Sequence, residues 1–188
     1  MWPGLDRCAT IGFRCAVDFL PDEDAPSVPQ ANVKTWVDGT GTWNTPSAWK
    51  PTGVPTPKDT VVISGRSSQV MLTQAAKVKD LWVTQGATLI FSNLAAVVDV
   101  TSDTICSGGT VTHVINSDTN DTDGWQVDGR VYIVCPNFPL ATYGAIDVNA
   151  KGFQPLGTGK GAGPGGGEVA AGSKNPGGGG HGGRDGNG

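Results

Sequence analysis

An acidic loop between residues 117 and 129 holds the side chains best suited to bind a metal ion. Calcium takes about six to eight oxygen ligands, and carboxylate and amide groups supply them. The candidate calcium ligands are Asp118, Asn120, Asp121, Asp123 and Asp128. Asp121, Asp123 and Gly124 fit the later part of an EF-hand loop, but Thr119 replaces the first ligand and no glutamate closes the loop. The alternative is a polar turn, because Asp, Asn and Gly favour turns for backbone reasons.

Tryptophan side chains are the candidate sugar-binding groups. A flat indole ring can stack on the apolar face of a pyranose. The candidate glycan-binding residues are Trp43, Trp49, Trp82 and Trp125. The competing interpretation is packing, because a stacked repeat structure must cover its open end and an indole buries a large area. For Trp43 and Trp49 we favour the covering role.

The four cysteines have no Cys-x-x-Cys spacing, which argues against a zinc site. Cys106 and Cys135 both lie in strand-like runs. Stacked strands could bring their Cα atoms within the roughly 4.4–6.8 Å that a disulfide requires. The alternative is a pair of buried free thiols that act as small apolar groups.

The sequence contains no recognisable catalytic motif. It has no Gly-x-Ser-x-Gly, His-Glu-x-x-His or phosphate-loop pattern. Several acids and one arginine could take part in polysaccharide cleavage, but nothing in their spacing demands it. They are Asp99, Asp118, Asp121, Asp123, Asp128, Arg130 and Asp147. Solvated turn residues are the simpler interpretation. We therefore expect no complete catalytic site in this chain.

Charge and hydropathy exclude other classes of partner. The net charge is −4 with no basic stripe, which argues against a nucleic-acid partner. No apolar run approaches the roughly 20 residues of a membrane helix, so we expect no membrane span. The first residues lack the basic and apolar regions of a signal peptide. We expect that the natural N-terminus lies upstream of Met1.

Short β-branched and aromatic runs dominate the chain between Val61 and Val148. Gly, Asn, Asp, Ser and Thr separate them, as between many short strands. Comparable runs recur about every 17–20 residues, at Val62, Leu81 and Val98, as in the stacked turns of a solenoid. The pattern predicts an all-β fold with a right-handed parallel β-helix between about residues 59 and 148. A β-sandwich is the alternative.

Composition divides the chain into four parts. Residues 1–20 carry two cysteines, and residues 21–32 form a proline-rich, acidic linker. The predicted solenoid occupies residues 33–150, and a glycine-rich tail occupies residues 151–188. Since glycine loses the most backbone entropy on ordering, residues 154–188 are expected to lack a stable isolated fold.

A short resemblance covers the N-terminal part. Residues 9–18 contain Gly-Phe-Arg-Cys-Ala at positions 12–16. This stretch resembles the closing strand of the formylglycine-generating (sulfatase-modifying) enzyme family. The family's catalytic cysteines lie upstream of that strand, and Cys15 matches a structural position. The resemblance implies that the chain is a fragment of a larger protein, and it transfers no activity.

A second resemblance covers residues 36–115. The residues that carry it include GTWN at 41–44, AWKP at 48–51, GVP at 53–55, DTVVI at 59–63, LWV at 81–83 and GATLIF at 86–91. They resemble secreted bacterial β-helix surface proteins with a G8-type domain, although Gln74 stands where an aspartate is common. Some G8-type proteins bind or cleave hyaluronan. The resemblance implies an extracellular or cell-surface location.

The sequence therefore favours a non-catalytic, structural or adhesive β-solenoid module outside the cell, with a polysaccharide or cell-surface glycan as candidate partner and calcium as candidate cofactor. The alternative is part of a polysaccharide lyase or hydrolase whose active residues lie outside this chain. A third reading is an architectural spacer between two other domains.

Overall fold

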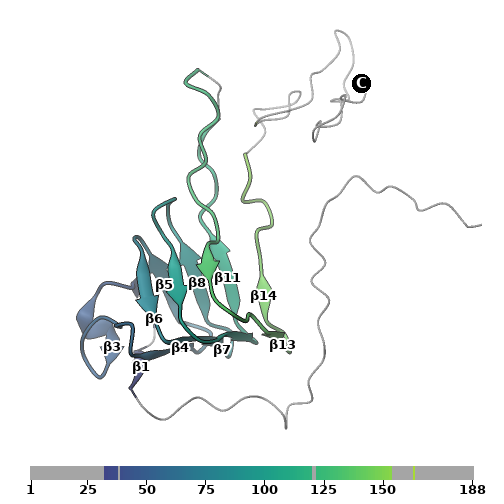
Figure 1. Ribbon diagram of the computed structural model, residues 1–188. Coiled ribbons are helices and arrows are strands. Elements are labelled where there is room, and N and C mark those ends of the chain that lie inside the picture. Colours follow the sequence, from purple (N-terminus) through teal and green to yellow (C-terminus); the bar gives the residue numbers. More distant parts are fainter. Residues whose placement is uncertain (1–31, 38, 120–121, 154–162, 164–188) are drawn as a thin grey trace, which may run out of the picture.

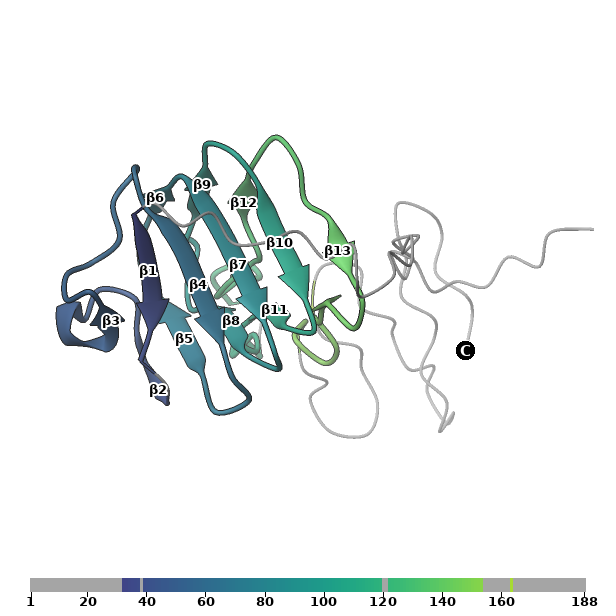
Figure 2. The same cartoon turned by 90° about the horizontal axis from the view of Figure 1, so that it is seen from below.

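The computed structural model describes residues 32–37, 39–119, 122–153 and 163. Within these residues the chain is all-β, with no α-helix and one 3-10 turn, η2 (Pro46–Ala48). Three sheets surround a common interior (Figures 1 and 2).

Sheet A has the order β13-β10-β7-β4-β1-β3. Its strands are β1 (Val33–Trp36), β3 (Trp49–Lys50), β4 (Thr60–Ser64), β7 (Asp80–Thr84), β10 (Thr104–Ser107) and β13 (Leu140–Ala141). Sheet B, in the order β14-β11-β8-β5-β2, has the strands β2 (Thr40–Thr42), β5 (Gln69–Leu72), β8 (Thr88–Phe91), β11 (Thr110–His113) and β14 (Ala145–Ile146). Sheet C, in the order β12-β9-β6, has the strands β6 (Ala76–Val78), β9 (Val98–Val100) and β12 (Ile133–Val134).

The chain visits the three sheets in turn. From β4 to β11, each strand pairs in parallel with the strand three positions later. Gln69 is aligned with Thr88 and Leu81 with Thr104, offsets of 19 and 23 residues. The offset of 19 lies within the predicted spacing of 17–20 residues, and the offset of 23 exceeds it. Among the named strands of the described ranges, only β1 and β3 pair antiparallel, which differs from the antiparallel sheets that a β-sandwich would have.

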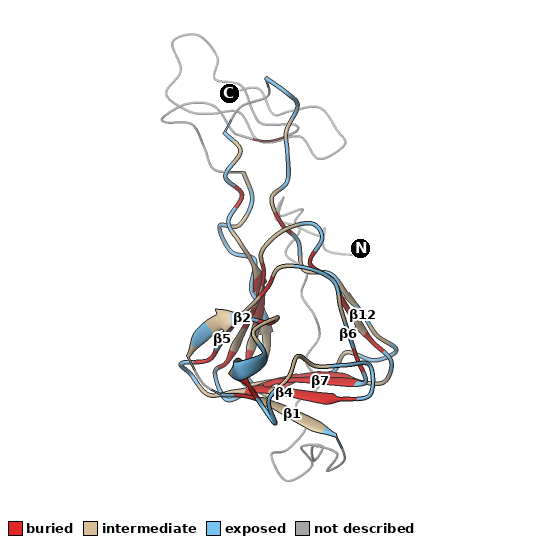
Figure 3. Ribbon diagram, turned by 90° about the vertical axis from the view of Figure 1, so that its left-hand side faces the viewer, coloured by how far each residue is buried: buried red, intermediate tan, exposed pale blue. Residues whose placement is uncertain are grey.

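The core consists of aligned apolar side chains from successive strands. Val61 lies beside Leu81 in sheet A, and Val70 lies beside Leu89 in sheet B. All four side chains are fully buried. Because side chains alternate between the two faces of a strand, every second residue of these runs points into the shared interior. The stacked rows thus form one continuous core (Figure 3).

Three indole rings close one end of this core. Trp49 contacts Trp36 and Trp43 edge to face, with ring centroids 5.0 and 5.1 Å apart. The indole N–H of Trp49 donates to the backbone oxygen of Trp43 at 2.7 Å. β3 pairs antiparallel with β1 and so covers the outer edge of sheet A. We call Trp36, Trp43 and Trp49 the tryptophan cap.

Glycines mark the corners where sheet A turns into sheet B. A Cβ atom on Gly109 would lie 2.5 Å from the backbone oxygen of Val83. A Cβ atom on Gly144 would collide with the backbone oxygen of Cys106. The backbones of successive turns approach each other so closely at these corners that only glycine fits.

Candidate functional site

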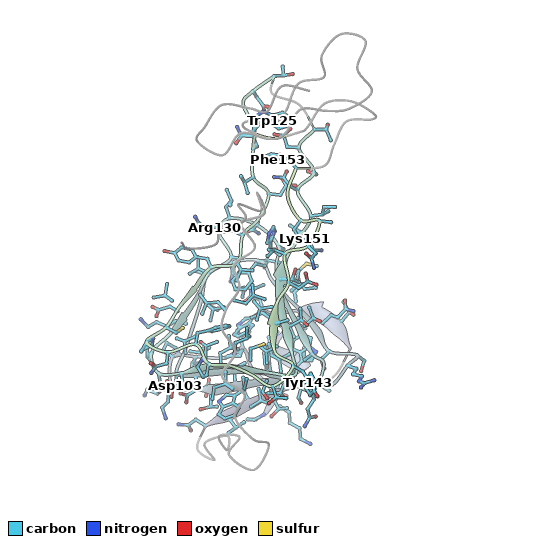
Figure 4. All side chains as sticks on the ribbon, turned by 90° about the vertical axis from the view of Figure 1, so that its right-hand side faces the viewer. Asp103, Trp125, Arg130, Tyr143, Lys151 and Phe153 are labelled. Atoms are coloured by element: carbon cyan, nitrogen blue, oxygen red, sulfur yellow. The ribbon has the colours of Figure 1, made fainter. Side chains whose placement is uncertain are left out.

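One part of the described chain projects from the body. It consists of residues 114–119 and 122–131, between β11 and β12, together with residues 147–153, which follow β14. We call these residues the arm. Figure 1 shows the arm rising beside β11 and β14, away from β1 and β3, and Figure 4 shows Trp125 and Phe153 on it. The arm also lengthens the last repeat, because Cys106 is aligned with Leu140, an offset of 34 residues.

Side-chain hydrogen bonds hold the arm together in place of a strand ladder. Asp128 Oδ2 accepts the backbone N–H of Ser117 at 2.6 Å. Asp118 Oδ2 accepts the backbone N–H of Gln126, also at 2.6 Å. Asn116 Nδ2 donates to the Gln126 oxygen at 3.2 Å. These three bonds join the two halves of the loop, so the acidic residues contribute to its shape.

The predicted calcium site finds no support in the described part of the arm. Asp118 and Asp128 each use a carboxylate oxygen for a backbone N–H across the loop. Within the described ranges, no group of three or more His, Cys, Asp or Glu side chains is placed to hold a metal ion. Asp123 is exposed. The predicted ligands Asn120 and Asp121 lie outside the described residues.

An aromatic pair lies near the end of the arm. The rings of Trp125 and Phe153 are 5.0 Å apart at an angle of 67°, and Figure 4 shows them together. A Cβ atom on Gly163 would lie 2.6 Å from Phe153 Cδ2, so the chain passes directly over this ring. Lower down, the Asn116 N–H donates to the Lys151 oxygen at 3.0 Å and joins the two parts of the arm. Trp125 keeps an intermediate exposure.

Most of the large exposed apolar side chains of the described ranges belong to the arm or to residues in and beside β12 and β14. They are Ile115, Val127, Tyr132, Val134, Ile146 and Val148. The others in the described ranges are Val37, Leu94 and Tyr143, which lies on a turn of the body. The Arg130 guanidinium lies 4.5 Å from the centroid of the Tyr132 ring. A cation over an aromatic ring at an exposed site is a favourable contact.

The four tryptophans predicted to bind glycans occupy different environments. Trp43 and Trp49 are each 1% exposed within the tryptophan cap, and Trp82 on β7 is 7% exposed. Their ring faces are therefore closed to a sugar in this structure. Trp125 alone among the four is partly open. Sequence reasoning missed the contact of Phe153 with Trp125, because 28 positions separate the two residues in the sequence. It also missed the contact of Arg130 with Tyr132.

The predicted disulfide between Cys106 and Cys135 is not formed, because both residues are free thiols. Cys106 is fully buried, and its Sγ atom is 3.2 Å from the Gly109 oxygen and 3.9 Å from the Ala145 oxygen. Burial raises the pKa of the Cys106 thiol, although both backbone hydrogen bonds oppose this effect. Cys106 therefore behaves as the small apolar core group that the sequence offered as an alternative. Cys8 and Cys15 lie outside the described residues.

The hydrogen bonds of Asp128 predict an acid-sensitive arm. The side chain and the backbone of Ser117 both hold the pKa of Asp128 below its ordinary value of 3.8. A carboxylate with a lowered pKa in the folded state stabilises that state above its unfolded pKa. This stabilising contribution is lost as the pH falls below 3.8 and through the lower pKa that Asp128 has in the folded state. Asp128→Ala should remove this stabilisation at neutral pH. The expected result is faster hydrogen exchange at the Ser117 amide.

Asp123→Ala is the matched control, because no described hydrogen bond uses the Asp123 carboxylate to join the two halves of the loop. The Ser117 amide should exchange at its original rate in this variant. Equal acceleration in both variants would show that the Asp128 bond does not hold the arm.

Comparisons with protein-family models, curated proteins and solved structures find no match to this chain. Among the described residues, no helix has the length and apolar character needed to cross a membrane.

Proposed function

We propose that this chain is a right-handed parallel β-helix module of an extracellular protein, and that its arm binds a polysaccharide or cell-surface glycan. The module supplies a rigid stack of strands, and the arm supplies the binding surface. Trp125 is the central contact in this proposal, with Phe153 holding its ring in place.

The strand pairing supports the β-helix part of the proposal. Each sheet receives one strand from each passage of the chain, and neighbouring strands run parallel. A connection between parallel strands is right-handed in nearly all proteins, which favours a right-handed coil. The tryptophan cap on one end agrees with the need of stacked repeats for a covered terminus.

The aromatic pair is the single observation that carries the binding part of the proposal. Trp125 is the one tryptophan of the predicted set with intermediate exposure, and it lies on a projection away from the core. Its edge-to-face contact with Phe153 limits the rotation of the ring. A ring that is already held in place loses less entropy when it binds a ligand. Arg130 and Lys151 lie lower on the arm and offer cationic donors for uronic acids.

Trp125→Ala tests this proposal directly. The full chain should be retarded in affinity electrophoresis through gels that contain hyaluronan, pectin or alginate. Removal of the indole should weaken binding to the retarding polymer at least about tenfold, equivalent to ~1.4 kcal/mol of binding free energy. Trp125→Phe should retain part of the affinity, because a smaller ring can still stack.

Tyr143→Asn is the control, because Tyr143 is 89% exposed and lies on a turn of the body away from the aromatic pair. Asparagine also tolerates the positive φ of 57° at this position. This variant should bind like the original chain. The glycan-binding proposal is wrong if none of the three polymers retards the chain, or if Trp125→Ala leaves the retardation unchanged.

A further inference from the structure

Two Asp-Gly steps lie in the loop of the arm, and this pair of residue types can react without a catalyst. Aspartate is followed directly by glycine at positions 123–124 and again at positions 128–129. The sequence has two further Asp-Gly steps, at Asp38 and Asp185, but both of these aspartates lie outside the described residues. The two steps of the arm have the same reacting groups, so we compare them by their surroundings.

The reaction is an attack of the backbone on the aspartate side chain. The glycine nitrogen forms a bond to Cγ of the preceding aspartate, and the carboxyl hydroxyl and the amide proton leave together as water. The product is a cyclic succinimide. Water then opens the ring at either carbonyl carbon, which restores aspartate or yields isoaspartate, in which the main chain runs through the side-chain carbon. Glycine favours the attack because it has no Cβ atom to shield its nitrogen.

The step at Asp123 and Gly124 is open to this reaction. Both residues are exposed. The Asp123 carboxylate makes no hydrogen bond or ion pair to another residue that the structure describes. A Cβ atom on Gly124 would have one described neighbour, Gln126 Nε2 at 4.0 Å. The carboxyl group can therefore turn toward the Gly124 nitrogen without breaking a described contact of its own.

The step at Asp128 and Gly129 is held in place. Asp128 Oδ2 accepts the backbone N–H of Ser117 at 2.6 Å, a charge-assisted bond that fixes the carboxylate across the loop. Gly129 is buried, and a Cβ atom on it would lie 3.2 Å from Val114 Cγ2 and 3.4 Å from the Phe91 oxygen. Ring closure would have to break the Ser117 bond and rotate a backbone that is packed against β8.

We propose that Asp123–Gly124 is a site of spontaneous succinimide formation and conversion to isoaspartate, and that the fold protects Asp128–Gly129 from the same reaction. The reaction needs only water, because both reacting groups belong to the chain. The proposal is independent of the proposed glycan binding, since it concerns a covalent change in the arm and not a ligand.

Isoaspartate at position 123 would change the arm around Trp125. The Gln126 side-chain amide donates to the backbone oxygens of Asp123 and Gly124, at 3.2 Å in each case. One additional carbon atom in the main chain would disrupt this arrangement directly before Trp125. The indole ring would then shift relative to Phe153, which it contacts in Figure 4.

Storage of the full chain in mildly acidic buffer, followed by peptide mapping, tests the proposal. Chymotrypsin cleavage after Trp125 places the two Asp-Gly steps on separate peptides, and an isoaspartate-specific carboxyl methyltransferase labels the converted residue in each. In the folded chain, isoaspartate should form at position 123 at least about tenfold faster than at position 128, a difference of ~1.4 kcal/mol in activation free energy. In strong denaturant the two rates should converge, because the contacts that protect Asp128 are lost.

Gly124→Asn is the second test, because asparagine tolerates the positive φ of 77° but shields the backbone nitrogen with a side chain. Conversion at position 123 should slow strongly in this variant, while conversion at position 128 keeps its rate. Asp123→Glu should remove the label from the first peptide, because the longer side chain closes a ring much more slowly. The proposal is overturned if the folded chain converts both steps equally fast, if position 123 does not convert, or if Gly124→Asn leaves its rate unchanged.

Discussion

Trp49→Ala is expected to lower the free energy of unfolding by about 3–5 kcal/mol, the usual cost of removing a large buried aromatic side chain. Trp49 is 1% exposed and packs edge to face against both Trp36 and Trp43. Its loss would leave a cavity at the end of the core and would leave the Trp43 oxygen without its indole donor. The cap would then no longer seal the first strands of sheet A.

Denaturant unfolding of the full chain measures this effect, with Trp49→Phe as the matched variant. Phenylalanine keeps most of the buried area but cannot donate to the Trp43 oxygen, so its cost should be intermediate. A loss below about 1 kcal/mol for Trp49→Ala, within the range of ordinary surface substitutions, would contradict the role of the tryptophan cap.

Phe91→Ala should be similarly destabilising, by about 3–5 kcal/mol. Phe91 is fully buried at the end of β8, where it is aligned with Leu72 on one side and His113 on the other. Its side chain points into the core that all three sheets share. Protein interiors are close-packed, so neighbouring strands cannot collapse far enough to fill the space that a phenylalanine leaves.

Leu94→Ala is the control for Phe91→Ala. Leu94 lies three residues further along the chain but is 47% exposed. Its removal should change the free energy of unfolding by no more than about 0.5 kcal/mol. Similar losses for the two variants would mean that the side chain of Phe91 does not lie in the core.

The strands of the body could be predicted because each combines a short β-branched run with turn residues at both ends. The runs at Val61, Val70, Leu81 and Leu89 all became strands. The sequence pattern did not reveal that β1 pairs in parallel with β4, or that β2 pairs in parallel with β5. Residues 33–58 nevertheless fell inside the predicted solenoid. β2 is Thr-Gly-Thr, which offers no apolar run to a sequence pattern. Its pairing with β5 became apparent only from the fold.

The candidate site was harder to predict, because the same side chain can serve different partners. A carboxylate oxygen accepts a backbone N–H as readily as it binds a calcium ion, and Asp118 and Asp128 accept backbone N–H groups. The exposure of a tryptophan depends on what lies against it. Trp82 points outward from β7 and is still covered, whereas Trp125 is partly open. No local pattern distinguishes these two cases.

The stacking of repeats is the central claim, because it sets both the shared core and the place from which the arm projects. Backbone NOEs between neighbouring strands of the full chain test it most directly. The expected result is a set of parallel-strand NOEs that link Val62 to Trp82 and Trp82 to Ile105. Antiparallel Hα–Hα NOEs between strands that follow each other in the sequence, such as β4 and β5 or β7 and β8, would contradict it.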